Sequence, residues 1–246
     1  MELNTFSIVG RCPRTGQLGV AVSSAVPAVG SMCPYTEAGV GAVTTQSWVN
    51  PALAIEVLAA LRRGLGAEAA LRDAIAADPG RELRQIGVVD AAGQAASHTG
   101  ALCTDWHGQI VGEGFAVQGN MLAGAQVLDA MASAFMAAAS EPLDERLMQA
   151  LEAGQRAGGD KRGKQSAALR IAGREAWPDV DLRVDEHASP VRELRRVLGV
   201  ARLQLYPFVA GMAKKAGSDG ALPESVTQML LMPPPLRPGG GGALPD

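Results

Sequence analysis

The sequence predicts an α+β domain built as a four-layer αββα sandwich, in which two stacked β-sheets lie between two layers of helices. The main observation is the order of elements along the 246 residues: strands, two helices, strands, two helices, strands and a helix. Separate blocks of this kind are typical of α+β layers, whereas alternating strands and helices would indicate parallel βαβ units. A second observation is composition. Glycine and alanine are abundant and aromatic residues make up only 4%, which favours closely packed sheets over an aromatic ligand cage.

The first block of strands begins with a β-hairpin. Two β-rich runs, Thr5–Gly10 and Leu18–Ser23, flank a Pro-Arg-Thr-Gly turn at 13–16. Proline presets the first turn position, and glycine accepts a positive φ near the end of the turn. Because the strands of a hairpin run antiparallel, we expect Ser23 and Ser24 to lie near the start of the first strand.

Hydrophobic spacing and turn residues predict the remaining elements. The expected strands are 39–46, 85–90, 94–99, 114–118, 165–172 and 181–184; the expected helices cover 67–77, 124–139 and 143–157, and two more start at Asn50-Pro51 and Ser189-Pro190. Asn50 is expected to cap its helix, with Ile55, Leu58 and Leu61 on the apolar face.

One domain is expected from residue 5 to residue 215, followed by a C-terminal extension at 216–246. From residue 233 the chain reads PPPLRPGGGGALPD. This composition is too poor in apolar side chains to bury a core, so we expect disorder from about that point.

Charge and cysteine content exclude several classes of function. Lysine and arginine total 22 against 25 aspartate and glutamate residues, so no basic surface for nucleic acid or an anionic membrane is expected. No apolar run reaches the roughly 20 residues of a membrane span, and no signal peptide is expected before the first strand. The odd set of Cys12, Cys33 and Cys103 has no C-x-x-C pair, which favours reduced thiols in a cytoplasm.

A metal site is not expected. His98, Cys103 and His107 have an H-x4-C-x3-H spacing that matches no standard metal motif, and no fourth ligand is evident. We therefore predict neither a metal nor a cofactor. The chain also lacks a G-x-S-x-G elbow and a P-loop.

Thr5 is the first of four places where polar residues could carry chemistry. By default it is an ordinary β-branched strand residue. If processing made it the first residue, its α-amine would lie beside its own hydroxyl, which is a nucleophile and a base in one residue. The second place is the end of the third strand, where Gln46 and Asn50 lie; the helix cap already explains Asn50.

The third place is the run Gln118-Gly-Asn120 between a strand and a helix. Amide side chains can donate to an oxyanion, while a polar turn is the ordinary alternative. The fourth place is Asp160, Lys161 and Arg162, which lie between glycines and could bind a carboxylate or a carbonyl oxygen. A solvated charge cluster is the alternative there.

Several runs together resemble a bacterial and archaeal family, the domain-of-unknown-function family 1028. They are TFSIVGRCPRTGQLGVAVSS, AVPAVGSMCP, AGVGAVTTQSWVNP, RQIGVVDAAGQAASHTG, GFAVQGNMLAG, LEAGQRAGGDKRGKQSAAL and VDLRVDEHASPVRELRRVL. The resemblance runs from Thr5 to about Leu198 and implies a fold of the N-terminal-nucleophile (Ntn) hydrolases, with threonine as the mature first residue. Here that threonine is Thr5.

The chain departs from the family pattern at three positions. Residues Met1 to Asn4 precede Thr5, so removal of the initiator methionine alone does not expose it. Ser24-Ala25 stands where the family often has Ser-Lys, and Trp106-His-Gly-Gln stands where it often has Trp-Ala-Gly-His. Since no lysine precedes Lys161, the base would be the α-amine itself.

Two functions follow as hypotheses. In the first, the protein hydrolyses a small-molecule, non-peptide C–N (amide) bond, with Thr5 as nucleophile and Asn120 or Gln118 as oxyanion donors. Substrate would be bound by Ser23, Ser24, Gln46, Asn50, Asp160, Lys161 and Arg162. In the second, the protein is a non-catalytic small-molecule-binding or assembly protein on the same fold. Neither nucleic acid nor membrane is an expected partner, and homo-oligomer formation is left open.

The Asp160–Arg162 loop carries a separate prediction. We expect it to face the same end of the sandwich as Thr5, because loops between a helix and a strand gather at sheet ends. Arg162 would either pair with Asp160 and fix the shape of the loop, or stay free as a clamp for a substrate carboxylate.

Overall fold

The computed structural model describes residues 2–3, 5–215, 217 and 219–244 of the chain. The chain divides into two compact units, Met1–Arg192 and Glu193–Asp246, and helix α5 (Pro190–Gln204) spans the division. Both β-sheets belong to the first unit. The expected single domain at 5–215 stays a prediction.

Sheet A is a five-stranded antiparallel sheet in which β5 pairs with three neighbours. Its strands are β1 (Glu2–Leu3), β4 (Pro34–Glu37), β5 (Gly41–Trp48), β6 (Arg84–Asp90) and β7 (Ala95–Thr99). The order is β1-β5-β6-β7, with β4 also paired to β5. β5 is buried from Gly41 to Ser47, because its small residues let other backbone and helices approach closely.

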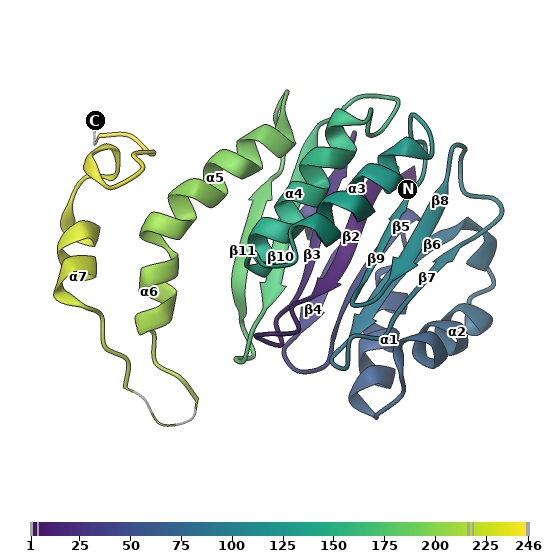
Figure 1. Ribbon diagram of the computed structural model, residues 1–246, viewed down its shortest axis with the longest axis horizontal. Helices are drawn as coiled ribbons and strands as arrows, with labels where there is room; N and C mark the ends of the chain where they lie inside the picture. The colour runs from purple at the N-terminus through teal and green to yellow at the C-terminus, as the bar shows by residue number, and fades with distance from the viewer. Residues whose placement is uncertain (1, 4, 216, 218, 245–246) are drawn as a thin grey trace. The chain divides into compact units, whose positions relative to one another are not determined.

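Sheet B has six antiparallel strands in the order β11-β10-β3-β2-β9-β8 (Figure 1). They are β2 (Thr5–Arg11), β3 (Leu18–Ser24), β8 (Gly108–Gly112), β9 (Phe115–Gly119), β10 (Ser166–Ala172) and β11 (Pro178–Val184). The hairpin β2–β3 is central. Its register pairs Thr5 with Ser24 and Arg11 with Leu18, as the sequence predicts.

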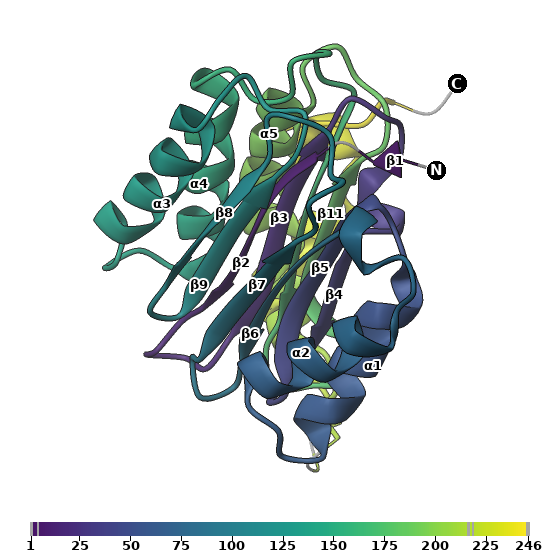
Figure 2. The ribbon, with the colours of Figure 1, turned by 90° about the vertical axis from the view of Figure 1, so that its right-hand side faces the viewer.

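Helices cover the outer side of each sheet (Figure 2). They are α1 (Pro51–Arg62), α2 (Ala67–Ala77), α3 (Gln126–Ala137) and α4 (Leu143–Arg156). The pair α1–α2 packs on β5, β6 and β7, and the pair α3–α4 packs on strands of sheet B. A β-carbon on Gly41 would lie 2.5 Å from Leu61 Cδ1, so glycine at that position lets α1 approach β5.

The two sheets face each other across a small apolar cluster. Val9, Val20 and Ala116 of sheet B pack there with Ala42 and Val89 of sheet A, and all five are completely buried. Such short side chains bring the sheets close together. Burial of apolar surface contributes about 25 cal/mol per Å², so this cluster and the helix-to-sheet contacts supply much of the stabilisation of the fold.

The second unit contains the rest of α5, α6 (Tyr206–Gly211), α7 (Glu224–Leu231) and a 3-10 turn at Pro234–Leu236. The turn lies in the segment where composition predicts disorder. Gln204 Nε2 donates to Pro238 O and to Gly240 O, both at 2.9 Å. These long-range contacts hold the described part of the segment, and composition alone does not reveal them.

The comparison with the sequence confirms a mixed α+β structure with antiparallel sheets. Asn50 caps α1 as predicted, its Oδ1 accepting from Ala52 N at 3.2 Å. The assignment of Ile55 to the apolar face is wrong, since Ile55 is 59% exposed. Leu58 and Leu61 are buried as predicted, and Leu53, Ala54 and Val57 are buried with them. The short strands β1, β4 and β8 and the helices α6 and α7 are not predicted by the sequence pattern. Within the described residues, no helix combines the length and apolarity needed to cross a membrane.

Candidate functional site

Thr5 begins β2 at one end of the two sheets, which we call the Thr5 end. There β2 starts beside the last residue of β3, Ser24, and Ser24 in turn pairs with the first residue of β10, Ser166. Thr5 is completely buried, and its Oγ1 donates to Ser24 Oγ at 3.2 Å. The hairpin register therefore brings two hydroxyl groups together, as the sequence predicts.

The carbonyl oxygen of Thr5 is held by two donors. Gln46 Nε2, from sheet A, donates to Thr5 O at 3.1 Å, and the backbone nitrogen of Asn120 donates to the same oxygen at 3.1 Å. A residue anchored from both sheets has little freedom to move. The first residue of β2 is therefore positioned more firmly than a strand end usually is.

Five buried side chains, which we call the amide cluster, join the two sheets at the Thr5 end. They are Ser7, Gln46, Gln85, Gln118 and Asn120, all fully buried. Gln46 Nε2 also donates to Gln85 Oε1 at 2.8 Å, and Ser7 Oγ donates to Gln46 Oε1 at 2.6 Å. Buried amides are costly unless they are hydrogen-bonded, and these bonds meet that need.

Gln85 is the centre of the amide cluster, although it is not among the site residues predicted from the sequence. Its Nε2 donates to Gly119 O at 2.9 Å and to Thr99 Oγ1 at 3.0 Å. Its Oε1 accepts from Asn120 Nδ2 at 3.0 Å as well as from Gln46. Its position in the sequence could have indicated this role, because Gln85 is a polar residue at the start of the apolar strand QIGVVD. Gln46 occupies a similar position at the end of the neighbouring strand, β5.

Gln118 is bound chiefly to β2. Its Nε2 donates to Ser7 O at 3.1 Å and to Ser7 Oγ at 2.7 Å, and its Oε1 accepts from Ser97 Oγ at 3.3 Å. A β-carbon on Gly87 would lie 2.1 Å from Gln118 Oε1, so only glycine leaves room for this side chain. The two amide hydrogens of Gln118 thus have acceptors already, and its oxyanion role stays a prediction.

The Asp160–Arg162 loop lies at the Thr5 end. Asp160 forms an isolated bridge with Leu122, and Gln165 N donates to Ser24 O at 2.8 Å just before β10. Arg162 Nη2 lies 2.7 Å from Asp160 Oδ2, and Arg162 Nε donates to Asp160 Oδ1 at 3.1 Å. Of the two alternatives, the structure has the pair that shapes the loop.

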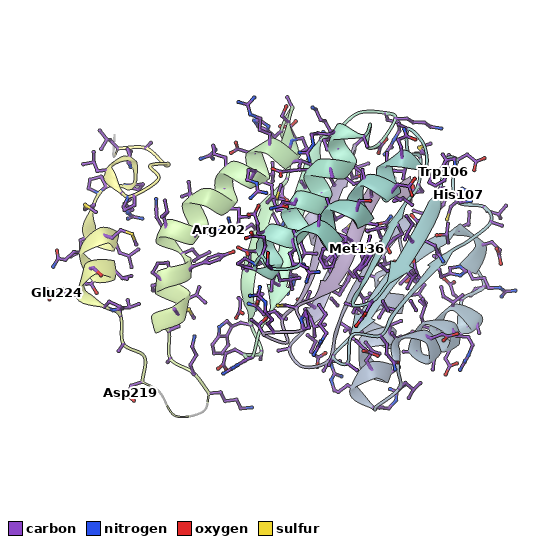
Figure 3. The ribbon with its side chains drawn as sticks, in the orientation of Figure 1. Trp106, His107, Met136, Arg202, Asp219 and Glu224 are labelled. Atoms are coloured by element: carbon purple, nitrogen blue, oxygen red, sulfur yellow. The ribbon has the colours of Figure 1, made fainter. Side chains whose placement is uncertain are left out.

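Lys161 and the loop before β8 also lie at the Thr5 end. Lys161 Nζ donates to Asp105 O at 2.6 Å, and Leu122 N donates to Trp106 O at 2.9 Å. Figure 3 labels Trp106 and His107 in that loop. The remaining predicted site residues lie nearby or in the α1 cap: Ser23 Oγ donates to Ser166 O at 3.1 Å, and Asn50 caps α1.

Replacing Arg162 with alanine should lower the free energy of unfolding by about 1–2 kcal/mol, since it leaves the buried Asp160 carboxylate without its cation. The Arg162 side chain is one-third exposed, and solvent screening keeps the loss at the lower end of the range for buried pairs. Chemical denaturation measures it. Arg72→Ala, which removes an exposed pair with Asp73, is the control and should cost under about 0.5 kcal/mol. Equal effects of the two substitutions would contradict a loop-shaping pair.

His98, Cys103 and His107, the residues considered as metal ligands, each contact a different partner. His98 Nε2 lies 2.9 Å from Arg81 O, and Cys103 Sγ donates to Arg84 O at 3.4 Å. His107 Nδ1 is 3.0 Å from Asp105 Oδ1 without hydrogen-bond geometry. Across the described ranges, no three His, Cys, Asp or Glu side chains gather as ligands.

Two of the three cysteines, Cys33 and Cys12, are poor candidates for chemistry. Complete burial raises the pKa of the Cys33 thiol to about 12, so this group stays protonated and is a poor nucleophile. Cys12 lies in the turn of the β2–β3 hairpin, beyond Arg11 at the opposite end of β2 from Thr5. Among the described residues at the Thr5 end, the candidates for chemistry are hydroxyls, amides and the thiol of Cys103, which donates to Arg84 O and lies next to Thr104, whose O accepts from Met121 N.

Two residues at the Thr5 end have unusual backbone conformations. Ser47 has φ 66° and Met121 has φ 50°, in the left-handed region that residues other than glycine rarely adopt. Ser47 follows Gln46, and Met121 follows Asn120. Strained residues of this kind persist where the surrounding structure holds them, and they gather at functional sites.

The residues before Thr5 are paired to the other sheet. In β1, Glu2 pairs with Trp48 and Leu3 pairs with Ser47, both in β5 of sheet A, whereas Thr5 belongs to sheet B. Asn4 lies outside the described residues. In the chain as it stands, the nitrogen of Thr5 is part of a peptide bond and is no base.

Comparisons with known proteins give a family and several solved structures that match this chain. The model of a family of unknown function, DUF1028, matches residues 5–194. The crystal structure of protein SPO2555 from Silicibacter pomeroyi, assigned to the same family, is 30% identical; the match covers 89% of this chain and 96% of that one, with a TM-score of 0.82. A comparison with curated proteins gives no match.

Two more distant structures also match. One is Anbu (ancestral β-subunit) from Yersinia bercovieri, 12% identical over 85% of this chain and 98% of that chain, with a TM-score of 0.35. The other is an Anbu mutant from Hyphomicrobium sp. strain MC1, 15% identical over 85% of this chain and 100% of that chain, with a TM-score of 0.36. These scores are too low to support an argument.

Proposed function

The chain belongs to DUF1028, a family of unknown function, and we propose that it is a hydrolase of a small-molecule, non-peptide C–N (amide) bond. Thr5 is the nucleophile once residues 1–4 have been removed. The observation that carries the proposal is the buried hydroxyl pair of Thr5 and Ser24, 3.2 Å apart, at a backbone position anchored by Gln46 and Asn120. A nucleophile requires such fixed geometry.

The proposed reaction has two steps, acylation of Thr5 and hydrolysis of the resulting ester. Thr5 Oγ attacks the substrate carbonyl carbon while the Thr5 α-amine takes the hydroxyl proton, and the carbonyl oxygen becomes an oxyanion. The C–N bond then breaks, the leaving nitrogen receives the proton, and an ester on Thr5 remains. Water attacks the ester, giving a carboxylic acid and restoring the Thr5 hydroxyl. The α-amine has a reference pKa of about 8, which suits a general base near neutral pH.

The contacts of the residues around Thr5 suggest a role for each of them in the proposed reaction. Asn120 is the proposed oxyanion donor, since its backbone already contacts Thr5. Gln46 and Gln118 hold the strands in place, and the Asp160–Arg162 pair shapes the rim to which Lys161 belongs. Ser23, Ser24 and Asn50 stay proposed substrate contacts.

The proposal extends to the fold and the setting. We assign the layers of helix pair, two sheets and helix pair to the αββα sandwich of Ntn hydrolases. A cytoplasmic location is proposed because Cys12, Cys33 and Cys103 are free thiols. A small-molecule substrate is the proposed partner, and nucleic acid and membranes are not; homo-oligomer formation is left open.

A chain lacking Glu2–Asn4 tests the proposal. In that chain Met1 directly precedes Thr5, and removal of the methionine exposes the threonine amine. We expect the shortened chain to release acid and amine from at least one member of a panel of small amides, while the uncleaved chain does not. Activity should rise with pH through an apparent pKa of about 8, because only the neutral amine accepts a proton. No hydrolysis by the shortened, folded chain would overturn the proposal.

One observation favours a second candidate function. Because Glu2 and Leu3 pair with β5, a chain that is never cleaved has no free amine at Thr5. It would then be a non-catalytic small-molecule-binding or assembly protein. That alternative predicts that ligand affinity is the same in Thr5→Ala, and a hydrolysis product that disappears in Thr5→Ala would reject it.

A further inference from the structure

We propose that the edge of β5 at Ser47–Trp48 binds the acyl side of the substrate as a short added β-strand. The favoured substrates are then amides whose acyl part is an N-acylated aminoacyl chain in extended conformation. This inference rests on the proposed function, because it takes Thr5 as the attacking group. It adds a substrate class and a subsite that the catalytic assignment does not contain.

The occupant of this edge in the structure is the segment of the chain that precedes Thr5. Glu2 pairs with Trp48 and Leu3 pairs with Ser47, antiparallel to β5. In the bond between residues 4 and 5, residues 2 and 3 lie on the acyl side. A substrate attacked by Thr5 Oγ must likewise place its carbonyl near Thr5, and so its acyl chain points the way that Glu2–Leu3 does.

The edge is available because the neighbouring strand is short. β4 pairs with β5 only as far as Pro34 opposite Thr44, and Thr45 N then donates to Cys33 O at 3.1 Å. Within the described chain, β1 alone pairs with β5 beyond that point on this side. Removal of β1 would leave an edge with unpaired backbone groups, which is a template for an added strand.

A buried hydroxyl supplies an independent sign of a ligand. Ser47 is completely buried, yet its Oγ has no hydrogen-bond partner in the described structure. A buried polar group without a partner costs about 1–3 kcal/mol. Backbone pairing with Leu3 leaves this oxygen without a partner, so a polar side chain of an incoming substrate at this residue is what would remove the cost. The left-handed φ of Ser47 is consistent with a site under strain.

The end of β5 is held in place before any ligand binds. Arg84 Nη1 donates to Trp48 O at 2.7 Å, and Arg84 Nε donates to Asp78 Oδ2 at 2.7 Å. The Arg84 guanidinium lowers the pKa of the Asp78 carboxyl, so the pair stays charged near neutral pH. A fixed strand end lowers the entropic cost of adding a strand. Trp48 is 41% exposed and can report binding through its fluorescence.

The test uses a peptide with the sequence of the displaced segment, N-acetyl-Glu-Leu-Asn amide, and chains that carry Thr5→Ala so that nothing is hydrolysed. The chain lacking Glu2–Asn4 should bind the peptide at least about tenfold more tightly than the chain that retains them. Methylation of the leucine nitrogen in the peptide should weaken binding about tenfold, because strand pairing needs backbone N–H groups.

A second variant allows the peptide-binding test even if deletion of Glu2–Asn4 lowers the stability of the protein. Leu3→Pro in the chain that retains the segment weakens strand pairing and should also permit peptide binding, and thermal melts establish that each variant is folded. Equal affinity of the peptide for the deleted and the retaining chains, or equal affinity of the methylated and unmethylated peptides, would overturn the subsite.

These binding results do not depend on hydrolysis. A shortened chain with intact Thr5 that hydrolyses amides but does not bind the peptide refutes only the subsite. One that binds but never hydrolyses refutes only the enzyme.

Discussion

Thr5→Ala in the chain that lacks Glu2–Asn4 is expected to reduce amide hydrolysis by about 10³-fold or more, because it removes the only proposed nucleophile. The substitution deletes the Oγ1 that donates to Ser24 at 3.2 Å but leaves the backbone contacts of residue 5 with Gln46 and Asn120. Release of acid and amine, followed by mass spectrometry, measures the loss. The fold should persist, because the anchoring bonds of this strand end go to its carbonyl.

Thr5→Ser is the matched control for this loss. Serine keeps the hydroxyl and, after processing, an α-amine, and it removes one buried methyl group at a cost of about 1 kcal/mol. We expect it to retain measurable hydrolysis. Activity that survives in Thr5→Ala at the level of Thr5→Ser would show that the hydrolysis is not catalysed by Thr5.

Gln85→Ala should lower the free energy of unfolding by about 3 kcal/mol or more. The change removes the oxygen that accepts hydrogen bonds from Gln46 Nε2 and from Asn120 Nδ2. It also takes the donor away from Gly119 O. Each buried hydrogen bond lost costs about 0.5–1.5 kcal/mol, and a buried group left with no partner costs about 1–3 kcal/mol. Urea denaturation measures the loss.

Gln109→Ala, in β8 of sheet B, is the matched control. Gln109 also makes hydrogen bonds, to Ser97 O at 2.9 Å and with Thr99, but it is exposed, so water can replace them. We expect a loss below about 1 kcal/mol. A loss for Gln85→Ala no larger than that for Gln109→Ala would contradict the view that the amide cluster fastens the two sheets together.

The parts of the site that lie within one hairpin were predictable from the sequence. The Pro-Arg-Thr-Gly turn sets the register of β2 and β3, and this register alone places Ser24 opposite Thr5. The position of the Asp160–Arg162 loop followed from the same reasoning about sheet ends. The choice between a loop-shaping pair and a free clamp needed coordinates, because both use the same residues.

The amide cluster was not predictable as a unit. Gln46, Gln85 and Gln118 come from β5, β6 and β9, and they meet because two sheets stack. Side-chain alternation along one strand does not say which residues of another sheet lie opposite. Gln85 could therefore be recognised only as an unusual polar residue at a strand start.

The missed strands have physical reasons. β4 is PYTE, which starts with a proline that is unfavourable within a strand. β8 is GQIVG, with glycine at both ends and an alternation of half-buried and exposed positions, so its sequence shows little hydrophobic pattern.

Ile55 was misplaced because the buried face of α1 includes a small residue, Ala54, beside Leu53 and Val57. Hydrophobic spacing that counts only large side chains does not place that face correctly.

The most direct test of the account is the intact mass of the chain produced without an N-terminal tag and kept at neutral pH. We expect a species that begins at Thr5, with residues 1–4 lost, and we expect this species alone to react with amides. A chain that always retains Leu3 and Asn4, in every preparation and over time, would contradict an N-terminal threonine nucleophile.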